Sequence, residues 1–112
     1  MFGLFERTKP FDNLDSNEFA SRYKQEPNAV LLDVRTAGEF HSGYIPGATN
    51  LDIMRGDFAS RVSTLDKNKT YFVYCRSGSR SAEACSILTS KGYKAINLAG
   101  GIGRWRGEIK HG

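Results

Sequence analysis

The fold is decided by the stretch Tyr71-Phe72-Val73-Tyr74-Cys75-Arg76-Ser77-Gly78-Ser79-Arg80-Ser81. Its first four residues are aromatic or β-branched and predict a short buried strand. The small and cationic residues around Gly78 predict a loop, and the residues from about Arg80 predict a helix with Ala84, Ile87 and Leu88 on one face. A strand, a tight loop and a helix N-terminus in this order gather backbone N–H groups around an anion.

Cys75 stands at the carboxyl end of the predicted strand. The helix dipole and the nearby Arg76 and Arg80 favour its thiolate form, which is the nucleophilic form of cysteine. A lone cysteine at the end of a strand is often a small buried hydrophobe instead. The arginines, serines and glycine that follow would pack poorly around such a thiol, so we interpret Cys75 as a functional cysteine.

Length and composition predict a single globular domain that handles small anions. The chain has 112 residues, a net charge of +4 and a pI near 9.2, with no run of like charges. This mild basic bias favours anionic small molecules or acidic partners over nucleic acid. The apolar start is too short for a signal sequence, and no apolar run reaches membrane length, so a cytoplasmic location without membrane contact is the default prediction.

The remaining segments alternate between helix and strand, which predicts an α/β sandwich around a mostly parallel sheet. A helix begins at Asp15, within a capping-box pattern, and ends before Pro27. Thr36 is expected to cap a helix over 36–42, with Gly43 as its left-handed stop. The other expected elements are strands over 29–32, 48–51 and 95–98, a helix over 57–65, and a short helix over 102–106 with Trp105 as a core anchor.

The domain is expected to span residues 13–112, preceded by a lead-in over 1–12. Phe2, Leu4 and Phe5 of this lead-in are candidates for docking on the domain. We find no linker and no internal repeat.

Parallel sheets bind ligands outside the carboxyl ends of their strands, so Asp33, Cys75 and the segment 98–101 are expected to share one edge. Asp33 is predicted to accept hydrogen bonds from backbone N–H groups of a neighbouring loop, and Arg35 to pair with Glu39. Both would support the site without reacting. The serines of the loop, Ser77, Ser79 and Ser81, would cap the helix or donate to substrate, and capping is the commoner use.

The second cysteine and the histidines receive structural interpretations. Cys85 lies on the helix after the loop and is expected to pack in the core, because a resolving thiol would need its Cα within roughly 7 Å of that of Cys75. His41 and His111 have no partners at metal-ligand spacing and are expected at the surface. No metal site, disulfide framework or cofactor is predicted.

Four segments in order resemble the rhodanese-like sulfurtransferase family and together span about residues 13–105. They are Leu31-Leu32-Asp33-Val34-Arg35, Glu39 to Ala48, Cys75 to Ser81, and Leu98-Ala99-Gly100-Gly101-Ile102. The resemblance implies a three-layer α/β/α sandwich around a mostly parallel sheet of about five strands. It also implies that Cys75 accepts a sulfane sulfur to become a persulfide. The chain departs from the family at Tyr44, where histidine is frequent.

The resemblance implies a sulfurtransferase. Its donor would be a small sulfur anion such as thiosulfate, and its acceptor would be cyanide, a thiol or a sulfur-carrier protein. The catalytic residue would be Cys75, acting by covalent catalysis in two half-reactions. The substrate-binding residues would be Arg76, Ser77, Gly78, Ser79 and Arg80, with Asp33 and Arg35 in support.

Two alternatives stay open at this point. A thiol phosphatase or arsenate reductase uses similar cysteine and arginine chemistry, but such enzymes place arginine after five intervening residues, whereas four separate Cys75 from Arg80. An interaction module could keep the fold without catalysis, although such modules commonly lose the cysteine that this chain retains.

Overall fold

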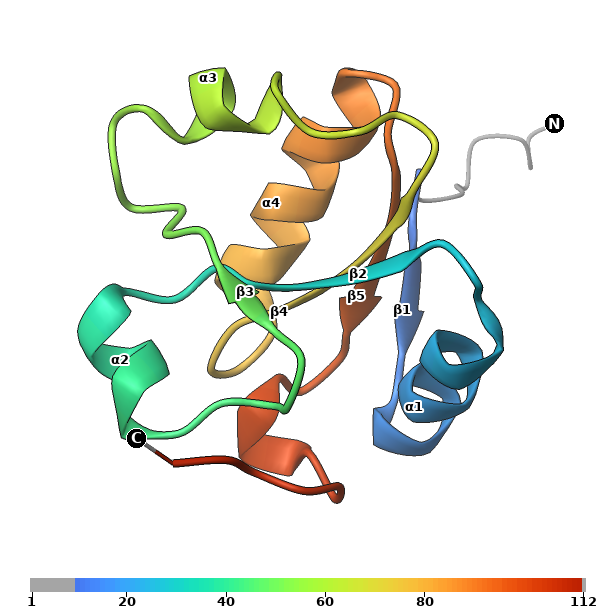
Figure 1. Ribbon diagram of the computed structural model, residues 1–112, viewed down its shortest axis with the longest axis vertical. Helices are drawn as coiled ribbons and strands as arrows, with labels where there is room; N and C mark the ends of the chain where they lie inside the picture. The colour runs from blue at the N-terminus through green and yellow to red at the C-terminus, as the bar shows by residue number, and fades with distance from the viewer. Residues whose placement is uncertain (1–9, 112) are drawn as a thin grey trace, which may run out of the picture.

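The computed structural model describes residues 10–111 and contains one five-stranded sheet. All the strand pairs are parallel, and the spatial order is β1-β5-β4-β2-β3 (Figure 1). The strands are β1 (Asp12–Leu14), β2 (Ala29–Asp33), β3 (Thr49–Asn50), β4 (Thr70–Tyr74) and β5 (Lys94–Leu98). The α/β sandwich expected from the sequence is therefore confirmed.

Helices cover both faces of the sheet. The helical elements are α1 (Ser16–Gln25), α2 (Ala37–Ser42), α3 (Phe58–Val62), α4 (Ser79–Ser90) and the short 3₁₀ helix η2 (Ile102–Arg104). One core cluster joins the sheet to α3 and α4 through Phe58, Val62 and Leu88. The other joins the opposite face to α1 and the η2 region through Phe19, with Trp105 packed against it. Continuous apolar runs in β2 and β4 follow from burial on both faces.

The N-caps of α1 and α2 are those predicted from the sequence, but the C-terminal end of α2 differs from the prediction. The Asp15 side chain accepts the Glu18 N–H at 2.9 Å, and Thr36 forms a reciprocal capping box with Glu39. Gly43 does end α2, but its φ of 157° and ψ of 135° lie outside the left-handed helical region that we predicted. The Gly43 N–H still bonds to the carbonyl of Phe40, so the helix closes without a left-handed turn.

Strand β1 was not predicted from the sequence, and residue 12 was expected in the lead-in. It pairs with β5 in the register Asp12–Ile96 to Leu14–Leu98, and the preceding Phe11 is buried in the core. The suggested docking of Phe2, Leu4 and Phe5 lies outside the described residues, and the division at residue 12 stays a prediction. Within residues 10–111, no helix has the length and apolar character needed to cross a membrane.

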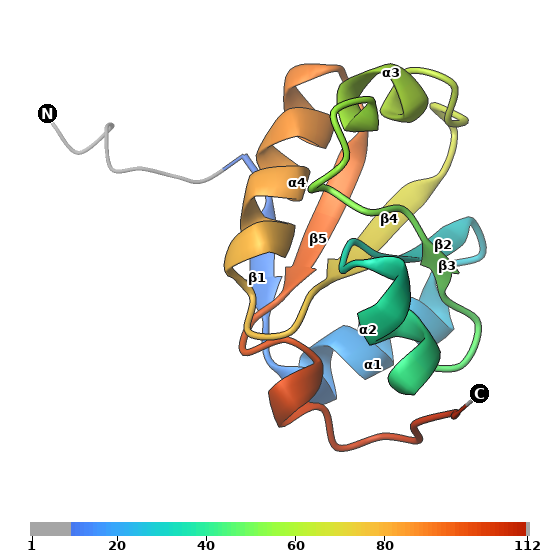
Figure 2. The same cartoon turned by 90° about the vertical axis from the view of Figure 1, so that its left-hand side faces the viewer.

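The loop between β4 and α4, helix α2 and helix η2 gather at one end of the molecule (Figures 1 and 2). This is the end at which β2 and β4 finish side by side, since Asp33 pairs with Tyr74 in the parallel register. The shared edge predicted for Asp33, Cys75 and the residues after β5 is thus confirmed.

Candidate active site

Cys75 is the first residue after the central strand β4, and its residue surface is fully inaccessible to solvent. Its Sγ atom nevertheless accepts a hydrogen bond from the Gly78 N–H at 3.1 Å and one from the Ser81 hydroxyl at 3.3 Å. Burial among the residues of the core therefore coexists with a polar cradle on the side of the loop. The thiol is held by the loop that the sequence singled out.

These hydrogen bonds control the ionisation of the thiol. Burial alone would raise the pKa of Cys75, because a thiolate loses its hydration there. Hydrogen bonds from the Ser81 hydroxyl and from the backbone N–H groups of Ser81, Gly78 and Ser77 outweigh burial and leave the pKa of Cys75 below its ordinary value. The cradle thus favours a negatively charged sulfur.

The segment after β5 donates hydrogen bonds to the first two carbonyl groups of the loop. The Ile102 N–H donates to the Cys75 carbonyl at 2.9 Å, and the Gly103 N–H donates to the Arg76 carbonyl at 3.1 Å. The two groups of a trans peptide point in opposite directions, so fixing the Arg76 carbonyl turns the Ser77 N–H the other way. This arrangement explains how several N–H groups come to face one sulfur atom.

Glycine is required where these two segments meet. A Cβ atom on Gly101 would overlap the backbone of Arg76 and Cys75, and the φ of Gly101 is +62°. Gly78 adopts a φ of 108°, and a Cβ there would lie 3.2 Å from the Gly100 nitrogen. The close contact between the loop and the segment after β5 therefore depends on both residues.

Arg80 forms an ion pair with Glu39 of α2. The guanidinium donates to both carboxylate oxygens, at 2.8 and 3.0 Å, and both side chains are about three-quarters buried. The bond from Arg80 lowers the pKa of Glu39 to about 2. Glu39 was not predicted as the partner of the loop, because we expected this carboxylate to pair with Arg35.

Arg35 instead pairs with Asp33. Its Nη2 atom donates to Asp33 Oδ2 at 2.6 Å and to the carbonyl of Gly43 at 2.7 Å. The Asp33 carboxylate accepts the N–H of Arg35 at 2.9 Å, and not that of a neighbouring loop. Both sequence predictions for these side chains were wrong in their partners, because residues two apart on an extended segment share a face. The pair is buried and ties β2 to the end of α2.

The other loop side chains are spread around the thiol. Arg76, Ser77 and Ser79 are exposed, whereas Ser81 is fully buried against Cys75. Among residues 10–111, no side chain caps α4, whose N-cap residue is Gly78. The predicted capping role of the serines is therefore wrong, and Ser81 acts as a donor to the thiol.

Cys85 lies in the core, as predicted, and both cysteines are free. Burial raises the pKa of Cys85 to about 12, so this thiol stays neutral near pH 7. His41 and His111 are at the surface, as expected. Among residues 10–111 no group of three or more histidine, cysteine or acidic side chains could hold a metal ion.

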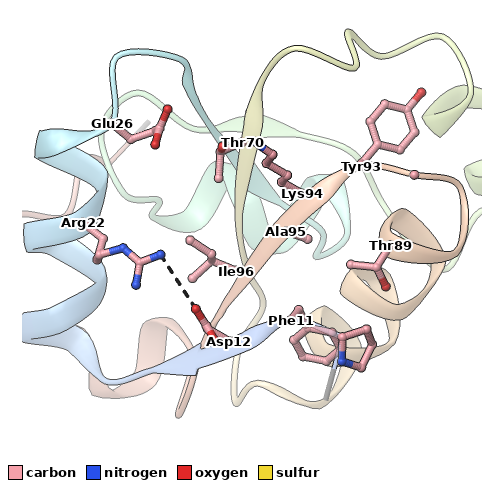
Figure 3. A pocket seen from close by; sticks show the side chains of 12 residues that line it. Phe11, Asp12, Arg22, Glu26, Thr70, Thr89, Tyr93, Lys94, Ala95 and Ile96 are labelled. Carbon is pink, nitrogen blue, oxygen red and sulfur yellow. Dashed lines mark ion pairs between the residues drawn. The ribbon is translucent and has the colours of Figure 1, made fainter. Parts of the chain in front are cut away.

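A cavity of about 610 Å³ lies elsewhere, against the starts of β4 and β5 at Thr70 and Lys94 (Figure 3). Arg22 and Asp12 at its rim form an ion pair at 3.7 Å, and both are exposed. Because Cys75 follows the other end of β4, this cavity is not part of the thiol site.

Comparisons with known proteins agree with this geometry. The family model described as "Rhodanese-like domain" matches residues 16–108. YtwF of Bacillus subtilis, whose name describes it as a candidate sulfurtransferase, is 44% identical over 80% of this chain and 84% of its own. A "Sulfurtransferase" of Allochromatium vinosum is 35% identical over 90% of this chain and 91% of its own.

Two further proteins extend the comparison. The "Thiosulfate:glutathione sulfurtransferase" of Saccharomyces cerevisiae is 29% identical and covers 98% of this chain and 88% of its own. The crystal structure of a rhodanese-like domain protein from Staphylococcus aureus has a TM-score of 0.78 at 26% identity, over 91% of this chain and 99% of that one.

Proposed function

Because the chain belongs to the rhodanese-like domain family, we propose that it is a single-domain sulfurtransferase that carries sulfur as a persulfide on Cys75. The observation that carries this proposal is the cradle around Sγ, in which the Gly78 N–H and the Ser81 hydroxyl both donate to the sulfur. Donors fixed before reaction stabilise a developing negative charge without reorganising. The names of several relatives, which include sulfurtransferases, support the same reaction class.

In the first half-reaction the Cys75 thiolate attacks the outer, sulfane sulfur of thiosulfate. A new S–S bond forms to Cys75, the S–S bond of thiosulfate breaks, and sulfite leaves with the electron pair. The hydrogen bonds that lower the pKa of Cys75 raise the fraction of the thiol that is present as nucleophile at neutral pH. The exposed Arg76 would attract the anionic donor and its leaving group.

In the second half-reaction a cyanide ion or a thiolate attacks the outer sulfur of the persulfide. The bond between the two sulfur atoms breaks, and its electron pair returns to Cys75 as a thiolate held by the same donors. We propose a small thiol or a sulfur-carrier protein as the cellular acceptor. The name of the Saccharomyces cerevisiae relative contains both thiosulfate and glutathione, which supports a thiol in this role.

The remaining loop residues would shape the site. Ser77, Gly78 and Ser79 would supply backbone N–H groups to the bound sulfur, and Arg80 would hold the loop against α2 through Glu39. Asp33 and Arg35 would support the edge of the sheet beside the loop. The cytoplasmic location remains a prediction.

Intact-protein mass spectrometry after thiosulfate treatment tests the proposal. We expect a gain of one sulfur atom, which disappears in Cys75→Ser and is reversed by cyanide. Cys85→Ala is the matched control and should still gain the atom, because Cys85 is buried and stays neutral. A wild-type protein that gains no mass from any sulfane donor would leave an interaction module as the better explanation, and phosphate ester hydrolysis lost in Cys75→Ser would favour a phosphatase.

A further inference from the structure

Asn97, the fourth residue of β5, lies against the Cys75 loop and has no part in the mechanism above. The residue is 2% exposed, and its Nδ2 atom donates to the Gly78 carbonyl at 3.3 Å and to Asn13 Oδ1 at 2.8 Å. The Gly78 carbonyl can only accept hydrogen bonds, so the amide nitrogen of Asn97 must be the atom that faces it. We infer that Asn97 is a positioning residue that sets the direction of the loop N–H groups around Cys75; its catalytic meaning rests on the proposed function.

The position of the Gly78 carbonyl determines the direction of two loop N–H groups, those of Gly78 and Ser79. It also accepts the Ala82 N–H at 3.1 Å, which begins α4. The Ser79 N–H belongs to the same trans peptide and therefore points away from the helix, toward the side where an anion would bind. The Gly78 N–H, which donates to Sγ, belongs to the preceding peptide group. The two peptide groups share the Gly78 Cα atom, so holding one of them also restricts the other.

Gly78 needs such a support because glycine restricts its own backbone least of all residues. Its φ of 108° is one of several conformations open to glycine, and the loop contains no side-chain cap that would select it. Asn97, on the neighbouring strand β5, favours this conformation through its hydrogen bond to the Gly78 carbonyl. Asn13 orients the Asn97 amide in turn, so the loop is connected across β5 to the edge strand β1.

Packing alone does not account for asparagine at this position. Within the part of the chain that the structure describes, Asn97 Oδ1 is a buried atom without a hydrogen-bond partner. A buried polar atom without a partner is costly, so an apolar side chain of similar size would fit the strand better if filling space were the purpose. The hydrogen bond from the Asn97 amide nitrogen to the Gly78 carbonyl accounts for an asparagine here.

The test measures the reactivity of Cys75 directly. In Asn97→Leu, alkylation of Cys75 by iodoacetamide at pH 7 should slow by roughly tenfold, and its pH profile should move to higher pH, because misdirected donors stabilise the thiolate less. Peptide mass mapping separates Cys75 from Cys85. Asn13→Ala removes the orienting acceptor from an exposed position and should change the rate in the same direction by a smaller factor.

Tyr93→Phe is the matched control. The Tyr93 hydroxyl donates to the carbonyls of Val62 and Leu65 at 2.7 and 3.1 Å, at the other end of β5. Its removal also leaves two backbone carbonyls without a side-chain donor, but should leave the alkylation rate within about twofold of wild type, because no donor to the sulfur is touched.

A folded Asn97→Leu variant with the wild-type pH profile would overturn the inference. If that variant does not fold, an Asn13→Ala variant with an unchanged profile overturns it instead. Alkylation requires no sulfur donor, so these outcomes are independent of the proposed function. A wild-type protein that never gains sulfur would remove the sulfurtransferase proposal and leave the role of Asn97 in setting thiol reactivity to be judged by alkylation.

Discussion

Arg80 and Glu39 are separated by 41 positions in the sequence and meet through two hydrogen bonds of 2.8 and 3.0 Å. The pair joins α4, the helix that follows the thiol loop, to the short helix α2. Its carboxylate offsets the charge of Arg80, so that the positive potential at the loop is smaller than the count of arginines suggests. Sequence spacing alone would assign both arginines to the anion.

Glu39→Gln should release the charge of Arg80 while keeping the cap of α2, because glutamine also serves at this position of a capping box. We expect a lower KM for thiosulfate and a steeper loss of activity with added salt, since an unpaired guanidinium attracts the donor more strongly. The measurement is steady-state kinetics at two ionic strengths. Thr36→Ala is the control: it loses the cap, about 1 kcal/mol, and should keep the wild-type KM. An unchanged KM in Glu39→Gln would show that Arg80 lies outside the field felt by the donor.

The same pair makes stability depend on acid. The pKa of Glu39 falls from 4.5 to about 2 through its bond to Arg80. A carboxylate with a lowered pKa stabilises the fold above its ordinary pKa, and this contribution disappears as the pH falls from about 4.5 through about 2. Urea unfolding at pH 6 and pH 3 should therefore show a larger loss of unfolding free energy for wild type than for Glu39→Gln, by about 1 kcal/mol after allowance for partial exposure. Equal losses would mean that the pair is not formed in solution.

Ser81→Ala should weaken the nucleophile without changing the fold. The Ser81 hydroxyl donates to Sγ at 3.3 Å, and its loss raises the pKa of Cys75 toward that of an ordinary thiol. We expect the rate of persulfide formation at pH 6.5 to fall by roughly tenfold and to recover partly at pH 9, where more thiolate is present. Ser79→Ala, at an exposed position of the same helix turn, is the control. A similar rate loss for both serines would argue against a specific role of the Ser81 hydroxyl.

Gly101→Ala tests the contact that turns the loop amides toward the sulfur. The new Cβ would overlap the backbone of Arg76 and Cys75, and alanine is strained at a φ of +62°. We expect a loss of unfolding free energy of roughly 2 kcal/mol, together with slower alkylation of Cys75. Gly38→Ala, in α2, has no atom within 4 Å of the new methyl and should be neutral or stabilising. Chemical denaturation and alkylation of both variants check the prediction, which fails if Gly101→Ala retains wild-type alkylation.

The sequence predicted the elements whose residues are uniform in character. The apolar runs before Asp33 and Cys75 are continuous because β2 and β4 are buried on both faces, and such runs can be identified without a structure. Strand β1 could not be found in this way. It has three residues, of which Asp12 and Asn13 are polar and exposed, and it lies at the edge of the described sheet, where β5 is its neighbour.

The residues of the candidate site were likewise predictable only in part. Cys75 and its loop were predicted because chemistry and local order coincide within one short segment. The partners of that loop were not, because Glu39, Asn97 and Gly103 reach it from three other elements through contacts that only the fold creates. The Arg35–Asp33 pair is a different case. Its spacing of two residues is typical of side chains on one face of a strand, and this signal was available in the sequence.

Strand β4 is the middle strand of five, with β5 on one side and β2 on the other. Cys75, which we propose as the reacting residue, is thus attached to the part of the sheet whose amide hydrogens should exchange most slowly with solvent, since they open only when the whole domain unfolds. Heat inactivation should then coincide with the loss of secondary structure in a single cooperative transition. The protein would have no folded but inactive state to pass through on heating.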